Sequence, residues 1–95
     1  MQDTTAKVKT VQVTVAFPLS KRGDYHHDAR EQETIGALRA AAMKHFHAQE
    51  EQGSEYYLTN DEADDARLPD SDTVAEVAGE ADTLALTLVK ELIQG

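Results

Sequence analysis

The chain contains no cysteine, and this absence excludes several kinds of chemistry at once. Without a thiol there is no disulfide framework, no thiolate nucleophile and no zinc site that depends on sulfur. The sequence also lacks an apolar run near the roughly 20 residues that cross a bilayer, and no basic stretch followed by an apolar segment opens it. We therefore expect a soluble, cytoplasmic protein.

Positive charge is scarce: 9 lysines and arginines stand against 18 aspartates and glutamates, which gives a net charge of -9. The excess belongs to residues 50–82, where one basic side chain accompanies twelve acidic ones. Such a surface repels phosphate groups, so we expect neither nucleic acid nor an anionic membrane as a partner. A basic protein groove would attract it, and a purely solubilising role is the alternative.

With 95 residues the chain can form one small domain with a single core, which leaves little room for a deep cleft between lobes. The sequence shows no Ser/His/Asp order, no glycine loop that would cradle a phosphate and no paired carboxylates with a pocket. We therefore expect that the chain is not an enzyme and binds no cofactor, and that it acts through its surface or its terminus.

Apolar residues in the first half predict two strands and one helix. Val11, Val13, Val15 and Phe17 alternate with smaller or polar residues, as in a strand with one buried face, and Pro18 closes it. Residues 19–24 then read as a hairpin connection to a weaker strand over residues 25–30. The helix is expected from Thr34, its cap, to Gln52, with Gly53 as the stop signal, and Glu50 and Glu51 predict fraying before that point. Its apolar face consists of Ile35, Leu38, Ala42 and Phe46.

The second half predicts two further strands joined by a long acidic loop. Residues 55–59 form the first of these, and the loop covers residues 60–72. A single helical turn over residues 73–77 ends at Gly79. The last strand follows, with Leu84, Leu86 and Leu88 on one face. These elements divide the chain into an N-terminal arm (residues 1–6), one domain (residues 7–90) and a C-terminal tail (residues 91–95).

This order of elements and four stretches of sequence resemble the ubiquitin-like β-grasp family. The similar stretches are Ala29–Ile35, Tyr56–Leu58, Leu68–Val77 and Asp82–Leu88. The resemblance implies an α+β fold in which a mixed sheet of four to five strands packs on one main helix, with the first and last strands as parallel neighbours. The acidity and the absence of cysteine also resemble bacterial ubiquitin-like modifiers.

A modifier of this family would react at Gly95, which follows the terminal strand. The resemblance implies that an adenylating activating enzyme would activate the Gly95 carboxylate, and that a cysteine carrier enzyme would pass it as a thioester to target proteins. A deconjugating metalloprotease is a further implied partner. Glycine suits this role because a residue without Cβ can thread a narrow channel. Leu92, Ile93 and Gln94 would be the tail residues that the activating enzyme contacts.

Two features differ from the family pattern and leave other roles open. Gln94 stands where family modifiers commonly have a second glycine, and the apolar patch on the sheet is diluted to Tyr57, Ala85 and Thr87. These three residues would instead form the partner-binding surface of an interaction module that is not conjugated. A sulfur carrier, in which Gly95 becomes a thiocarboxylate, is a third possibility.

Four histidines form two pairs, and only a close approach of the two would make a metal site. His26 and His27 precede the helix, and His45 and His47 lie near its end. Residues two apart on a helix point in different directions, so His45 and His47 cannot share a ligand by themselves. We expect no metal site.

Overall fold

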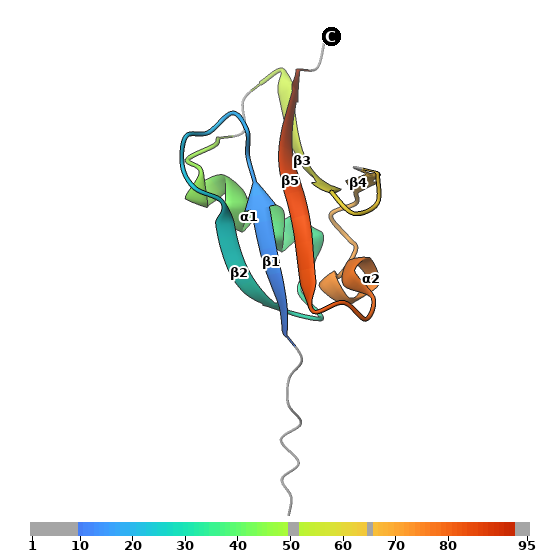
Figure 1. The fold of residues 1–95 in the computed structure, drawn as a ribbon. Helices are drawn as coiled ribbons and strands as arrows, with labels where there is room; N and C mark the ends of the chain where they lie inside the picture. Colours follow the sequence, from blue (N-terminus) through green and yellow to red (C-terminus); the bar gives the residue numbers. More distant parts are fainter. Residues whose placement is uncertain (1–9, 50–51, 65, 93–95) are drawn as a thin grey trace, which may run out of the picture.

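The computed structural model describes residues 10–49, 52–64 and 66–92, which form one mixed sheet with a helix across one face (Figure 1). Its elements are β1 (Thr10–Ala16), β2 (Tyr25–Arg30), α1 (Ile35–His45), β3 (Ser54–Asn60), β4 (Ala66–Leu68), α2 (Val74–Ala78) and β5 (Thr83–Leu92). The strand order is β2-β1-β5-β3-β4, and β1 and β5 are parallel neighbours in the middle of the sheet. The expected α+β fold is confirmed.

Alternation along the strands produces the core. The residues with odd numbers from 11 to 15 on β1 and those with even numbers from 84 to 88 on β5 are buried, because they face α1. Of the two adjacent tyrosines on β3, Tyr56 is buried and Tyr57 lies on the other face of the sheet. Phe17 lies just after β1, where its ring packs 5.4 Å from the ring of Phe46. The described part of the fold therefore has one continuous core.

The start of α1 was predicted correctly, and its end was not. Thr34 has extended backbone angles, and its Oγ1 accepts a hydrogen bond from Ala37 N at 3.2 Å. The predicted end near Gln52 is wrong because α1 stops at His45. His47 has a left-handed φ of 57°, and the N–H of Ala48 bonds back to Met43 O at 2.8 Å.

This ending is a Schellman motif, in which a left-handed residue turns the chain away and satisfies the last carbonyls of the helix. Glycine usually occupies the left-handed position, and here it is His47. The turn redirects the chain toward β3 several residues before the glycine that we expected as the stop. Gly53 does adopt a positive φ of 87°, but it precedes β3 instead of ending α1.

The predicted loop over residues 60–72 contains one element that the sequence did not reveal. The three residues of β4 pair antiparallel with Leu58–Asn60 of β3. So short a strand carries almost no alternation of its own, and its pairing is decided by tertiary contacts. After it, Thr73 begins α2 with a capping box that also involves Glu76, and Gly79 ends the helix as predicted.

The starts of α1 and α2 lie side by side and share backbone hydrogen bonds. Ile35 N donates to Asp72 O, and Val74 N donates to Glu33 O, each at 2.8 Å. The segment before each helix therefore supplies acceptors for the first N–H groups of the other, which have no partner within their own helix. This exchange places the chain that follows β4 against the first turn of α1.

Candidate functional site

At the end of β5 only one edge of the strand is paired, and the partner is β3. β1 pairs with β5 from Thr83 to Thr87, whereas β3 pairs with it from Leu86 to Leu92. Figure 1 shows β5 running past β1 along the sheet. Within the described residues, the final part of β5 is therefore held by β3 alone.

Leu92 is the only expected tail contact that the structure describes. It belongs to β5, lies opposite Ser54 and is 73% exposed. The strand thus continues beyond residue 90, where we expected the domain to end. Ile93, Gln94 and Gly95 lie outside the described residues.

The three residues expected to bind a partner lie on the same sheet face, which is the face opposite α1. Tyr57 is opposite Val89 in the β3–β5 register, and Thr87 precedes Val89 by two residues on that face. Ala85 precedes Thr87 by two more and pairs with Thr14 of β1. The structure brings the three together, and their role in binding stays a prediction.

Two of these side chains already have partners within the chain. Thr87 Oγ1 donates a hydrogen bond to Asp61 Oδ1 at 2.7 Å. The guanidinium of Arg67 lies 4.3 Å from the centroid of the Tyr57 ring, which is within the range of a cation–π contact. The surface available to a partner is therefore more polar than the residue types of the expected patch imply.

An apolar hollow that the sequence analysis missed lies beside this face. Leu19, in the connection between β1 and β2, is 70% exposed and borders a hollow of about 220 Å³. A leucine after Pro18 in a turn was the available signal, but it could not show that the turn folds next to β5. The lining residues are Phe17, Pro18, Leu19, Thr87, Leu88, Val89 and Lys90.

Besides its contact with Tyr57, Arg67 of β4 forms an ion pair with Glu55 of β3. Both of its terminal nitrogens donate to the carboxylate of Glu55 on β3, the longer contact being 3.5 Å. Glu55 in turn lies directly opposite Glu91 of β5. The hydrogen bond to Glu55 raises the pKa of Arg67 above its usual range, and the negative charge of Glu91 contributes to the rise.

A hollow of about 470 Å³ between α1, β3 and β4 contains two arginines, each held by an acid. Arg39 Nε and Nη2 donate to the two oxygens of Asp70 at 3.1 and 2.8 Å. Arg67 is paired with Glu55. Since both guanidinium groups face carboxylates of the chain itself, the hollow offers no uncompensated charge to an anionic ligand.

The histidines take separate partners. His27 Nε2 donates to Glu33 Oε1 at 3.0 Å, and His45 Nε2 donates to Gly23 O at 3.0 Å. His47 accepts from Arg22 Nη2 at 3.1 Å. In the ranges that the structure describes, no three His, Asp or Glu side chains are grouped so as to hold a metal ion. No helix in these ranges is long and apolar enough to span a membrane.

Known proteins resemble this chain in structure but not in sequence. No model of a known protein family and no curated protein matches the chain. The archaeal ubiquitin of Caldiarchaeum subterraneum is similar in structure, with a TM-score of 0.65 and 17% identity over 90% of this chain and 99% of that one.

Two further solved structures agree. ATG8 of Trypanosoma brucei has a TM-score of 0.63 and 18% identity, covering 92% of this chain and 78% of its own. A chain from a structure described as molecular mimicry of SUMO that promotes DNA repair has a TM-score of 0.64 and 14% identity, covering 90% and 96%. The chain has the ubiquitin-like β-grasp fold. Identities this low show the fold alone, so the role of this ubiquitin-like chain has to be argued from its own residues.

Proposed function

We propose that this ubiquitin-like chain is a protein modifier of the bacterial type, joined to target proteins through the carboxylate of Gly95. The observation that carries the proposal is the end of β5. The strand runs without interruption to Leu92, which is 73% exposed and paired on one edge only. Residues 93–95 continue from that point.

In this chemistry the chain would be a substrate and not a catalyst. An activating enzyme would join the Gly95 carboxylate to AMP from ATP and release pyrophosphate. The thiolate of a cysteine carrier enzyme would then displace AMP to form a thioester, and a target amine would displace the thiol to form an isopeptide bond. A metalloprotease would reverse the last step by hydrolysis. None of these steps requires a catalytic side chain from the modifier itself.

The test is the covalent structure of the products. The chain is expressed with candidate adenylating and cysteine enzymes, and conjugates are digested and sequenced by mass spectrometry. We expect a bond between the Gly95 carboxyl group and a lysine of a target, and no such adduct when Gly95 is deleted. Conjugates that persist unchanged without Gly95 would refute the proposal. Replacement of one Gly95 carboxyl oxygen by sulfur, without a second protein attached, would instead identify a sulfur carrier.

A second candidate function is supported by the apolar hollow beside β5. Leu19 is largely exposed at its border, and Tyr57, Ala85 and Thr87 occupy the adjoining sheet face. A ubiquitin-like interaction module that is never conjugated would use this surface to bind a partner protein. Calorimetry with a co-purifying partner distinguishes the two roles. An amidated C-terminus should leave the affinity of a module intact, whereas Tyr57→Ala should lower it.

A further inference from the structure

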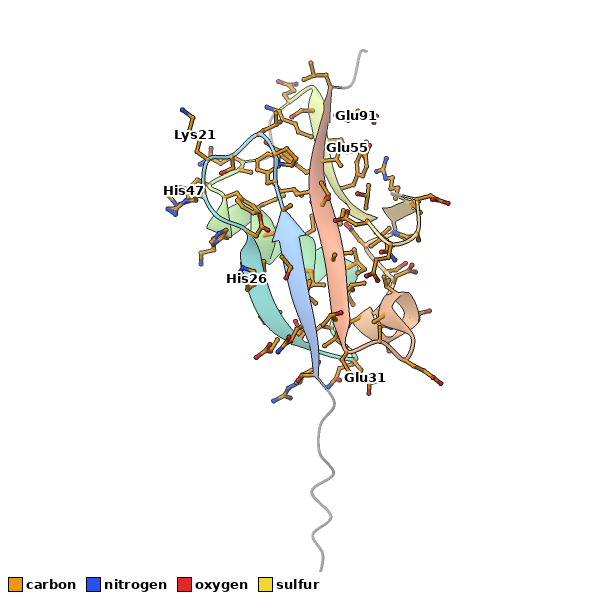
Figure 2. The ribbon with its side chains drawn as sticks, in the orientation of Figure 1. Lys21, His26, Glu31, His47, Glu55 and Glu91 are labelled. Carbon is orange, nitrogen blue, oxygen red and sulfur yellow. The ribbon has the colours of Figure 1, made fainter. Side chains whose placement is uncertain are left out.

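Two glutamates face each other near the end of β5. Glu91 lies directly opposite Glu55 in the antiparallel β3–β5 register, and both point to the sheet face away from α1. Figure 2 shows the two residues at the same end of the sheet. Like charges directly opposite each other destabilise an antiparallel pair. The strand therefore carries an unfavourable pair next to its last described residue, Leu92.

Arg67, on the neighbouring strand β4, offsets the repulsion between Glu55 and Glu91. Its guanidinium donates two hydrogen bonds to Glu55 and rests on the ring of Tyr57, which fixes its position on the sheet. The charge of Glu91 also acts on it. Arg67 on β4 is therefore hydrogen-bonded to the carboxylate on β3, directly across from which stands the carboxylate on β5. Removal of Arg67 would leave both carboxylates facing each other with neither the hydrogen bonds nor the positive charge.

The backbone of this segment has one strand partner. β1 pairs with β5 only as far as Thr87, so Glu91 and Leu92 pair with β3 and with no other strand among the described residues. Their separation from β3 would leave the core residues of β5, which end at Leu88, in place. The end of the strand can therefore open without unfolding the domain.

We propose that Arg67 is a clasp that sets how far the C-terminal tail extends. With the clasp closed, Glu91 and Leu92 stay paired with β3. With it open, these two residues separate from β3, and the segment that leads to Gly95 gains about 7 Å of reach. The use of the longer tail rests on the proposed function, because an activating enzyme must draw the Gly95 carboxylate into its own site.

The clasp is tested by amide hydrogen exchange, measured by NMR on the full chain. Protection is compared in the wild type, Arg67→Gln, Glu91→Gln and the double variant. Arg30→Gln is the matched control, since it removes the same charge from an exposed position on β2, at the other edge of the sheet. Arg67→Gln should lower protection roughly threefold at the Glu91 amide, which points to β3, as expected for an uncompensated like-charge pair. Leu86 and Leu88 should be unchanged.

The double variant shows whether the loss of protection in Arg67→Gln is caused by the charge of Glu91. Once Glu91 is neutral, loss of Arg67 should change protection at residue 91 much less, and Arg30→Gln should have no effect there. Unchanged protection in Arg67→Gln would overturn the clasp, and so would an equal loss at Leu88, because that would mean general destabilisation. These measurements use the isolated chain. The exchange data can therefore refute the clasp without refuting conjugation at Gly95. The absence of conjugates would likewise leave the clasp unrefuted.

Discussion

Gly36 in the first turn of α1 lies directly against Asp70, which follows β4. A Cβ atom on residue 36 would stand 3.1 Å from Asp70 Cβ and 3.3 Å from Asp70 O. The same carbonyl accepts a hydrogen bond from Gly36 N at 3.0 Å. The absence of a side chain therefore allows the chain after β4 to reach the start of the helix.

Gly36→Ala should destabilise the protein although alanine is the better helix former. The gain in helix propensity is about 1 kcal/mol in a helix interior and smaller in the first turn. The added Cβ would also crowd Asp70, which cannot move away without stretching the hydrogen bond from the N–H of residue 36 to its carbonyl. We expect a net loss of about 1 kcal/mol in urea unfolding. Gly23→Ala is the control, because no atom lies within 4 Å of its added Cβ. A more stable Gly36→Ala protein would contradict this account.

The ion pair between Arg39 and Asp70 should make part of the stability depend on pH. The hydrogen bond from Arg39 holds the pKa of Asp70 below its usual value. A carboxyl group whose pKa is lowered by folding stabilises the native state above its unfolded pKa of about 3.9, and this contribution disappears as the pH falls through the folded pKa. Because the Asp70 side chain is 55% exposed, we expect less than about 1 kcal/mol.

Asp70→Asn measures this contribution. Its unfolding free energy should lie below that of the wild type near pH 7, and the difference should shrink as the pH falls below about 4 and through the lowered pKa of Asp70. Asp24→Asn, at an exposed position in the connection between β1 and β2, is the comparison variant. A difference that persists undiminished at about pH 3 would show that Asp70 stabilises the fold by packing instead of charge.

The capping box of α2 should contribute measurably to stability although the helix is short. Thr73 Oγ1 accepts from Glu76 N at 3.2 Å, and Glu76 Oε1 accepts from Thr73 N at 2.9 Å. Thr73→Ala removes the cap and should cost about 1 kcal/mol in chemical denaturation. Glu76→Gln keeps an acceptor at the same place and should cost much less. Equal losses in both variants would point to charge instead of capping.

The sequence predicted the elements whose signal is local and periodic. The alternation of valines on β1 and of leucines on β5 identified their buried faces, and Thr34 marked the start of α1. The end of α1 could not be found in this way, because His47 takes a left-handed conformation that sequence patterns assign to glycine. The pairing of β4 was also hidden, since it depends on contacts between distant segments.

Less of the candidate site was predictable than of the fold. Alternation on β5 placed Ala85 and Thr87 on one face, and the resemblance to the ubiquitin-like family added Tyr57 to them. Alternation could not show that Arg67 covers Tyr57, because that contact requires β4 to pair with β3. The opposition of Glu55 and Glu91 likewise depends on the register between two strands, and a shift of one residue would have separated the side chains to opposite faces.

Leu19 should prove dispensable for folding, and this would separate a binding role from a structural one. Its side chain is 70% exposed, so Leu19→Ser should change the unfolding free energy by no more than about 0.5 kcal/mol. Leu58 is fully buried on β3, and Leu58→Ala should cost about 2 to 5 kcal/mol through lost burial and a cavity. A Leu19 that contributes nothing to stability would leave its side chain available for contact with another protein at the apolar hollow. If Leu19→Ser instead destabilises the fold by more than about 1 kcal/mol, Leu19 holds the β1–β2 connection against β5. The exposure of Leu19 would then no longer support the hollow as a binding surface.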